Sequence, residues 1–234
     1  MRLDKYICKS SELTRNEAKK LLKGGEVTVD GEVIKNGAFK VPKGAEVISS
    51  GQVLSLLGHR YIMMNKPQDT ICSNVDEVHP SLLHFLDVDR AFELHIAGRL
   101  DADTTGLVFI TDDGQWSHNI TSPKKHCEKT YRVWLEQPLI EQDLEEITEQ
   151  FKSGVQLNGE SGLTLPATLV AIEETEMLLT ITEGKYHQVK RMFAAVGNKV
   201  VGLHRESIGS IVLDDDLMMG EWRDLTEQEI AKFS

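Results

Sequence analysis

Residues 98–107 read Gly-Arg-Leu-Asp-Ala-Asp-Thr-Thr-Gly-Leu, an Arg-x-Asp pair and an Asp-x-Thr-Thr-Gly turn set directly before an apolar run. The run continues to residue 111 and is typical of a buried strand. A carboxylate in so short a loop is positioned by the strand that follows it, so Asp101 is a candidate nucleophile or general base. The same residues also fit a simpler interpretation, in which Asp101 caps its loop and pairs with Arg99.

A second stretch, Lys129-Thr130-Tyr131-Arg132, places an aromatic residue among basic ones. Residues 118–132 hold four Lys or Arg and one Glu. An aromatic ring between cations can stack on a nucleic-acid base while its neighbours hold phosphates. Taken alone, Tyr131 fits equally well as a core residue of a strand.

A third stretch, residues 183–193, reads Glu-Gly-Lys-Tyr-His-Gln-Val-Lys-Arg-Met-Phe and predicts a helix over 186–196. Tyr186 and Val189 fall on its apolar arc, and Lys190 lies at the edge of that arc. A Lys in this place can reach a buried carboxylate and keep it ionised. An ordinary amphipathic helix with a solvated basic face fits the same pattern.

The net charge of the 234 residues is −11, which at first argues against a nucleic-acid partner. The charge is unevenly distributed, because residues 1–57 hold 10 basic and 7 acidic side chains and residues 58–234 hold 16 and 30. We expect the acidic segments 136–151, 173–176 and 214–216 to face away from any bound RNA.

The first 57 residues predict a small module. Thr14 and Glu17 form a capping-box pattern that begins a helix, and Gly24-Gly25 ends it. Asp30-Gly31 between alternating apolar residues predicts a hairpin, a strand over 46–49 closes the module, and residues 50–59 are interpreted as a linker. Basic side chains recur every fourth residue on the helix, at Arg15, Lys19 and Lys23. They form either a nucleic-acid-binding ridge or a solvated face.

The remaining residues mix strands and helices without regular alternation, which favours an α+β fold with a mixed, mainly antiparallel sheet flanked by helices. Strands are expected over 61–65, 107–111, 130–135, 167–172, 177–182, 199–203 and 210–213, and helices over 140–151, 186–196 and 226–232.

Several classes of protein lack support in the sequence. The three cysteines are widely spaced and the eight histidines scattered, so neither a disulfide framework nor a metal site is expected. The glycine-rich signatures of nucleotide-cofactor folds are missing. No apolar run approaches the length of a membrane span, and the charged N-terminus does not resemble a signal peptide, so we expect a cytoplasmic protein.

Four motifs, in order along the chain, resemble those of the RsuA/RluA group of pseudouridine synthases. They are Asn65-Lys66-Pro67, the stretch 98–107, Lys129-Thr130-Tyr131 and the stretch 183–193. The N-terminal module resembles an S4 RNA-binding domain of the α/β-L type. The resemblance implies an S4 domain over 1–57 and a catalytic domain over 58–234.

The resemblance also implies a role for individual residues. Asp101 is the catalytic carboxylate, as a nucleophile or a base, with Tyr131 packed on the target uracil and Lys190 holding the carboxylate ionised. Many relatives have Arg where this chain has Lys190, which keeps the charge but loses the bidentate geometry. The expected substrate-binding residues are Arg99, Val189, Lys66 and Arg191, and the expected RNA-binding residues of the S4 module are Arg2, Arg15, Lys19 and Lys23.

The implied reaction isomerises a uridine in RNA to pseudouridine and requires neither cofactor nor metal. The motifs are most similar to the RsuA branch, which implies uridine 516 of 16S rRNA as target, and 16S rRNA or the assembling small subunit as partner of a monomer. Three alternatives stay open: a synthase for a large-subunit uridine, a non-catalytic S4-type rRNA-binding or assembly factor, and a glycosidase-like hydrolase using Asp101 and Asp103.

Overall fold

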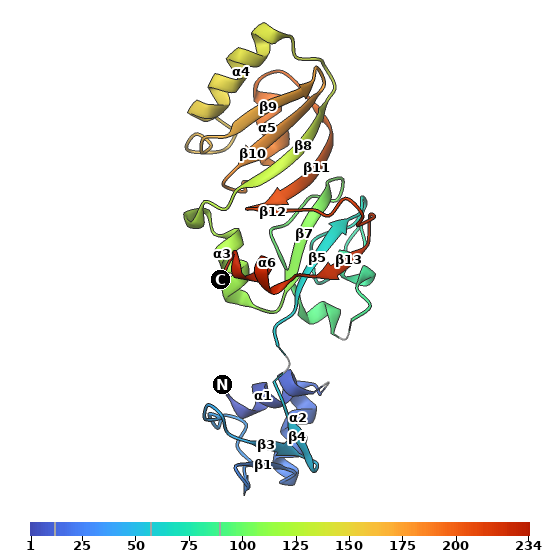
Figure 1. The fold of residues 1–234 in the computed structure, drawn as a ribbon, viewed down its shortest axis with the longest axis vertical. Helices are drawn as coiled ribbons and strands as arrows, with labels where there is room; N and C mark the ends of the chain where they lie inside the picture. Colours follow the sequence, from blue (N-terminus) through green and yellow to red (C-terminus); the bar gives the residue numbers. More distant parts are fainter. Residues whose placement is uncertain (12, 57, 89) are drawn as a thin grey trace. The chain divides into compact units, whose positions relative to one another are not determined.

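The computed structural model describes residues 1–11, 13–56, 58–88 and 90–234. The chain forms two compact units, Met1–His59 and Arg60–Ser234 (Figure 1). The boundary predicted at residue 57 lies outside the described residues. Each unit has its own hydrophobic core, so each is described by itself.

The first unit packs two helices on a four-stranded sheet of order β2-β1-β3-β4. Its elements are α1 (Leu3–Ser10), α2 (Arg15–Gly24), β1 (Val27–Val29), β2 (Glu32–Val33), β3 (Val47–Ser49) and β4 (Gln52–Leu54). The predicted capping box is present, since Glu17 N–H donates to Thr14 Oγ1 and Thr14 N–H to the Glu17 carboxylate. Gly25 ends α2 in the left-handed conformation.

Strand β4 corrects the linker that the sequence predicted over residues 50–59. Ser50 and Gly51 both have positive φ, 47° and 80°, and join β3 to β4 as a two-residue hairpin turn. Two left-handed residues are the geometry that tight hairpins need, so this Ser-Gly pair continues the sheet instead of leaving it.

The second unit is built on one nine-stranded mixed sheet, in which β13-β5-β7-β11-β8-β10-β9 follow one another and β6 and β12 pair with β7 and β11. Among the described strand pairs, β7 with β11 is parallel and the others are antiparallel. The strands are β5 (Tyr61–Lys66), β6 (His95–Ala97), β7 (Thr105–Thr111), β8 (Lys129–Leu135), β9 (Thr168–Glu173), β10 (Glu176–Ile181), β11 (Val200–Ile208), β12 (Ile211–Val212) and β13 (Trp222–Asp224).

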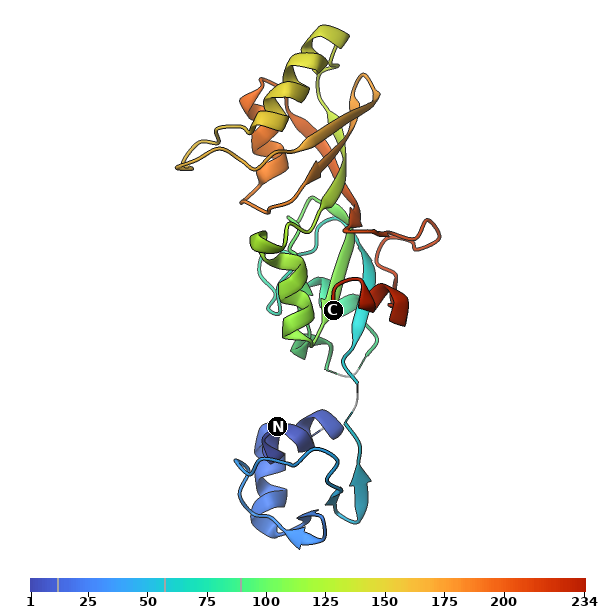
Figure 2. The ribbon, with the colours of Figure 1, turned by 60° about the vertical axis from the view of Figure 1, so that its left-hand side comes forward.

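Helices cover both faces of this sheet, in agreement with the predicted α+β class. Figures 1 and 2 show α4 (Glu141–Ser153) and α5 (Gln188–Ala195) beside β8, β10 and β9, and α3 (Gly114–Thr121) and α6 (Glu227–Ala231) beside β5 and β7. Short 3₁₀ helices are η1 (Leu82–Phe85), η2 (Ala91–Glu93) and η3 (Pro123–Lys125). In the described parts of the chain, no helix is both long and apolar enough to cross a membrane.

Strand β7 is buried on both faces, as its continuous apolar sequence predicts. Val108 and Ile110 join the core beneath α4 and α5, where the rings of Phe151 and Phe193 meet with centroids 5.3 Å apart. Phe109 points into the opposite core, beneath α3 and α6. The loop that carries Asp101 therefore leads into a strand that cannot shift without disturbing two cores.

Helix α5 begins two residues later than the sequence predicts. His187 precedes it in a left-handed conformation, with φ +47°. Tyr186 is consequently outside the helix, and its side chain is exposed instead of packing on the apolar arc. A helical pattern in the sequence does not reveal that one residue has a positive φ. The sequence therefore predicted the start of this helix two residues too early.

Candidate active site

Asp101 lies on the loop between β6 and β7, and backbone hydrogen bonds fix this loop on both sides. Thr104 N–H donates to Asp101 O at 3.1 Å, and Asp69 N–H donates to Ala102 O at 2.9 Å. Leu100 N–H donates to the buried Cys72 sulfur at 3.2 Å. The carboxylate is thus presented from a backbone that has little freedom to move.

Lys66 supports this loop from beneath. Its side chain is 0% exposed, and its Nζ donates to the carbonyls of Pro67, Ala102 and Thr104 at 3.0, 3.3 and 2.8 Å. Burial lowers the pKa of the Lys66 ammonium, and nearby carboxylates oppose that effect. This corrects the role predicted for Lys66: its ammonium is engaged by the protein backbone and positions the catalytic loop, because no part of it reaches the surface.

The close approach of β7 and β11 explains why the motif has glycine at position 106. Gly106 pairs with Arg205 where β7 and β11 run parallel, and its φ is +104°. A Cβ at this position would lie 2.4 Å from the Arg205 carbonyl oxygen. Only glycine allows the two strands to approach here.

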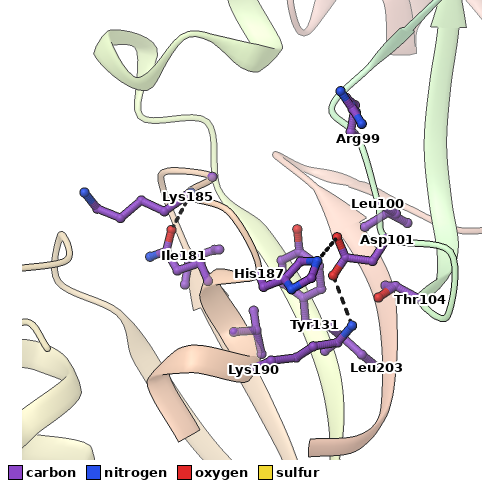
Figure 3. A pocket seen from close by; sticks show the side chains of 13 residues that line it. Arg99, Leu100, Asp101, Thr104, Tyr131, Ile181, Lys185, His187, Lys190 and Leu203 are labelled. Atoms are coloured by element: carbon purple, nitrogen blue, oxygen red, sulfur yellow. Dashed lines mark hydrogen bonds and ion pairs between the residues drawn. The ribbon is translucent and has the colours of Figure 1, made fainter. Parts of the chain in front are cut away.

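Two nitrogen-bearing side chains reach the Asp101 carboxylate from the segment 187–190 (Figure 3). Lys190 Nζ donates to Asp101 Oδ2 at 3.0 Å, and His187 Nε2 lies 3.3 Å from Oδ1. Arg99 points away from this carboxylate (Figure 3). The structure therefore pairs Asp101 with Lys190 and His187, and not with Arg99 as the simpler interpretation of the sequence had it.

Lys190 holds a second carboxylate, since its Nζ also donates to Asp103 Oδ1 at 2.6 Å. Burial alone would lower the pKa of Lys190, but Asp103 and Asp101 together raise it above its usual value. Burial would raise the pKa of Asp103, but Lys190 outweighs it and holds that pKa below its usual value. Lys190 is thus charged at neutral pH, and it places a cation directly beside the Asp101 carboxylate.

A pocket opens beside Asp101, and apolar and polar side chains share its walls. Tyr131 from β8 and Leu203 from β11 line it together with Val189 from α5. Arg99 and Asp101 lie at its polar side (Figure 3). A flat, partly polar molecule fits such a combination of aromatic, aliphatic and charged walls.

Arg205 is a buried residue of this region that the sequence did not single out. Its guanidinium is 1% exposed and donates to Leu107 O at 2.7 Å and Gly98 O at 2.9 Å. It also lies 3.4 Å from the Tyr131 hydroxyl and 5.9 Å from the centre of that ring. Arg205 thereby joins the catalytic loop to the tyrosine of the pocket. Nothing in the local pattern around residue 205 indicates burial.

The remaining predicted residues lie elsewhere. Arg191 does not line the pocket; it binds the Glu160 carboxylate and the carbonyls of Tyr186 and Asn158. In the first unit Arg2 pairs with Asp4 at 2.7 Å and lowers the pKa of that carboxyl. The side chains predicted to form a basic ridge on α2 are all exposed: Arg15, Lys19 and Lys23.

Two expectations about acidic residues can be compared with the pocket. Of the described residues that line it, Asp101 is the one acid, and none comes from 136–151, 173–176 or 214–216. Asp103 does not line it. Because Asp101 and Asp103 bind the same ammonium from one side, they do not face each other across a substrate as the carboxylates of a glycosidase do.

Comparisons with known proteins agree with this arrangement. Residues 60–195 match the family described as RNA pseudouridylate synthase, and residues 1–47 match the S4 domain. The chain is 58% identical over 231 residues to ribosomal small subunit pseudouridine synthase A of Vibrio cholerae, covering 99% of this chain and 98% of that protein. It is 56% identical over 232 residues to the protein of the same name from Escherichia coli K12, covering 99% of each. A crystal structure described as a pseudouridylate synthase matches with a TM-score of 0.72 and 48% identity over the whole of both chains.

Proposed function

The chain belongs to the RNA pseudouridylate synthase family, and on this basis we propose that it converts one uridine of small-subunit rRNA to pseudouridine at Asp101. That it is an rRNA pseudouridine synthase follows from the family and from relatives matched over nearly their full length. The identity of the target uridine and the catalytic role of Asp101 go beyond the family and are what we propose. This membership argues against the non-catalytic alternative.

The reaction exchanges one bond for another within the substrate. The N1–C1′ bond of uridine breaks, the uracil turns, and C5 bonds to C1′. The proton on C5 leaves and N1 gains a proton, so the product has the composition of the substrate. No external reactant enters this balance, and we therefore expect no cofactor.

The observation that carries the proposal is the Asp101 carboxylate, which Lys190 Nζ contacts at 3.0 Å and His187 Nε2 at 3.3 Å, at the edge of a pocket walled by Tyr131. Three routes use such a carboxylate: attack on C1′, attack on C6 of the base, or removal of a proton from the sugar. Each requires the anion that Lys190 stabilises through a charge-assisted hydrogen bond. The geometry is compatible with all three.

The target base has to leave its stack before C1′ and C5 can reach Asp101, which costs a few kcal/mol. Tyr131 is the aromatic wall on which the extruded uracil would stack, returning roughly 1–3 kcal/mol. Val189 would line the other side of the base, and Arg99 at the open edge of the pocket would occupy the space that the extruded base leaves. Tyr131 is also in place to move the proton at C5.

For the target we propose uridine 516 of 16S rRNA, presented as free rRNA or in an assembling small subunit. The names of the similar proteins from Vibrio cholerae and Escherichia coli support a small-subunit target. The exposed cations of α2 supply phosphate contacts for the same RNA.

Mapping pseudouridine in the rRNA of cells with and without this protein tests the proposal. We expect one position in 16S rRNA to lose its modification when the protein is absent. Loss of a modification in large-subunit rRNA instead would contradict the proposed target while leaving the reaction class intact.

The role of Asp101 is tested by a matched pair of substitutions. Asp101→Asn should reduce pseudouridine formation by at least about 1,000-fold, since the anion is lost. Asp103→Asn removes a carboxylate that binds the same Lys190 but lies outside the pocket, so it should retain activity within about tenfold. A near wild-type rate for Asp101→Asn would overturn the assignment.

A further inference from the structure

Tyr186 is the most exposed aromatic side chain of the protein, and it lies next to the catalytic residues. Its exposed fraction is 75%, against 44% for Phe85 and 37% for Trp134; the described residues include every Phe, Trp and Tyr. Tyrosines are usually at least half buried, since the ring gains free energy by leaving water. An aromatic ring left in water beside an active site calls for an explanation.

The ring is held flat and in place. Tyr186 stacks on the imidazole of His187 with ring centroids 3.8 Å apart and planes inclined by 20°. The Tyr186 carbonyl accepts a hydrogen bond from Arg191 at 2.9 Å, and the left-handed φ of His187 sets the direction in which the chain enters α5. One face of the tyrosine is therefore covered by His187, and the other is free.

This pair of rings is joined directly to the catalytic carboxylate. His187 Nε2 lies 3.3 Å from Asp101 Oδ1, and His187 lines the pocket (Figure 3), whereas Tyr186 does not. Tyr186 thus lies just outside the pocket, stacked on the ring of His187, which lines it. A nucleotide that neighbours the pocket-bound uridine would meet this ring first.

The cations around the rings are matched by carboxylates. Lys185, Lys190 and Arg191 lie on the same segment as Tyr186. Glu160 pairs with Lys185 and Arg191 at 3.2 Å each, and Lys190 binds Asp101 and Asp103. The exposed ring is therefore the part of this surface suited to single-stranded nucleic acid, through base stacking more than through phosphate contacts.

We propose that the free face of Tyr186 is a stacking subsite for the RNA base next to the target uridine, supported from behind by His187. This inference rests on the proposed function, because it takes RNA as the ligand. The subsite would hold the neighbouring nucleotide while the uridine enters the pocket, and would fix the direction of the strand across the site. Stacking is tolerant of base identity, so the subsite contributes affinity and register more than sequence preference.

A rival role for Tyr186 is to shield the contact between His187 and Asp101 from water. Tyr186→Leu separates the two roles, because leucine keeps apolar cover but offers no aromatic face. Tyr186→Phe keeps the ring. Phe92→Ala, at a site 43% exposed on η2, removes an exposed ring that lies outside the pocket lining and serves as the matched control.

The first experiment measures binding without turnover. The probe is a short 16S rRNA fragment carrying uridine 516, with 2-aminopurine in place of nucleotide 515 or 517, titrated to saturation with the full-length protein. For one of the two probes we expect wild type, Tyr186→Phe and Phe92→Ala to quench the fluorescence and Tyr186→Leu and Tyr186→Ala to leave it bright. Equal quenching by wild type and Tyr186→Ala with both probes, or no quenching by wild type, would overturn the proposal.

The second experiment pairs each variant with RNA that has an abasic nucleotide at the quenched position. Tyr186→Ala should weaken binding of the intact RNA by between about 5- and 150-fold, and removal of the base should do the same to wild type. The two changes together should cost no more than either alone, since they remove the same contact. Additive losses would contradict the subsite.

Pseudouridine formation on the same RNA is scored separately. If wild type quenches the probe but forms no pseudouridine, the proposed function fails while the subsite stands. If wild type forms pseudouridine and Tyr186→Leu binds and quenches as wild type does, the subsite fails while the proposed function stands.

Discussion

The cations of helix α2 and three cations of the second unit lie in opposite surroundings. Arg15 and Lys19 stand in solvent with their charges available to a partner. Lys66, Arg205 and Lys129 are buried, and each donates to backbone carbonyls of its own unit. Side chains of equal charge are thus exposed to solvent in one region and hold the backbone in the other.

Desolvation accounts for the difference. Burial lowers the pKa of both Lys66 and Lys129, and carbonyl oxygens take the place of the water that each ammonium has lost. A buried cation in this setting fixes the course of the backbone whose carbonyls it binds. An exposed cation adds little to the free energy of folding, and its removal changes stability little. Substitutions in the two regions should therefore affect different measurements.

The largest effect is expected for Arg205. Arg205→Met leaves the carbonyls of Leu107 and Gly98 without donors and should lower the free energy of unfolding by about 3 kcal/mol or more. The melting temperature should fall by roughly 10 °C, measured by calorimetry. Arg99→Met, at an exposed arginine of the loop that Arg205 binds, is the control and should melt as wild type while losing RNA modification. Similar melting temperatures for the two variants would remove the distinction between buried and exposed cations.

Substitution of Lys66 should have the second-largest effect on stability. Lys66→Met withdraws the donor from three carbonyls and should cost about 2 kcal/mol of stability in urea unfolding. Because Ala102 and Thr104 flank the Asp101 backbone, we also expect kcat to fall by about tenfold with little change in KM. Lys125→Met, at an exposed lysine, should leave the unfolding curve unchanged. A rise in KM with unchanged kcat would show that Lys66 contacts substrate after all.

Substitution of the exposed cations of α2 should weaken RNA binding and leave stability nearly unchanged. Replacing Arg15, Lys19 and Lys23 together with Gln should leave the melting temperature within about 1–2 °C of wild type. Affinity for rRNA should fall by at least about tenfold at low salt, and the slope of log affinity against log salt should become shallower by about 2 to 3. Unchanged salt dependence would mean that this helix does not contact phosphates.

The smallest effect concerns Lys190 and its two carboxylates. The pKa of Asp103 is held below its usual value, so the pair adds stability above about pH 4 and loses it as the pH falls through the lowered pKa. The Asp103 side chain is 61% exposed, which limits the contribution to less than about 1 kcal/mol. The stability difference between wild type and Lys190→Met, from urea unfolding between pH 3 and 8, should therefore disappear in acid. A difference that grows in acid would contradict the pairing.

Local sequence patterns predicted the local structure well. The capping pattern of Thr14 and Glu17 and the turn at Asp30-Gly31 both formed, because their hydrogen bonds and φ angles depend only on adjacent residues. The edge position of Lys190 likewise predicted its reach toward a carboxylate, and the structure brings it to Asp101. Asp101, Tyr131 and Val189 all line one pocket, although they lie far apart in the sequence.

The rest could not be predicted because it depends on distant contacts or on a single backbone angle. Burial of Lys66 and Arg205 arises only when segments distant in the sequence pack over their strands, and the local sequence around a charged side chain does not indicate this. The place of His187 beside Asp101 follows from one left-handed residue that helical periodicity does not detect. Strand β4 was missed because Ser50-Gly51 serves a hairpin as readily as a linker.

The parallel pairing of β7 with β11 has a consequence for the order in which the enzyme matures. Thr105 Oγ1 and His204 Nδ1 meet at 2.8 Å although 99 residues separate them, and Gly106 pairs with Arg205 beside them. Contacts so distant in the sequence form late and slowly during folding. During synthesis the ribosome releases Asp101 long before Lys190 and residue 205, so a growing chain has its acid but not its partners. We therefore expect activity toward rRNA to begin only after residue 205 has been translated.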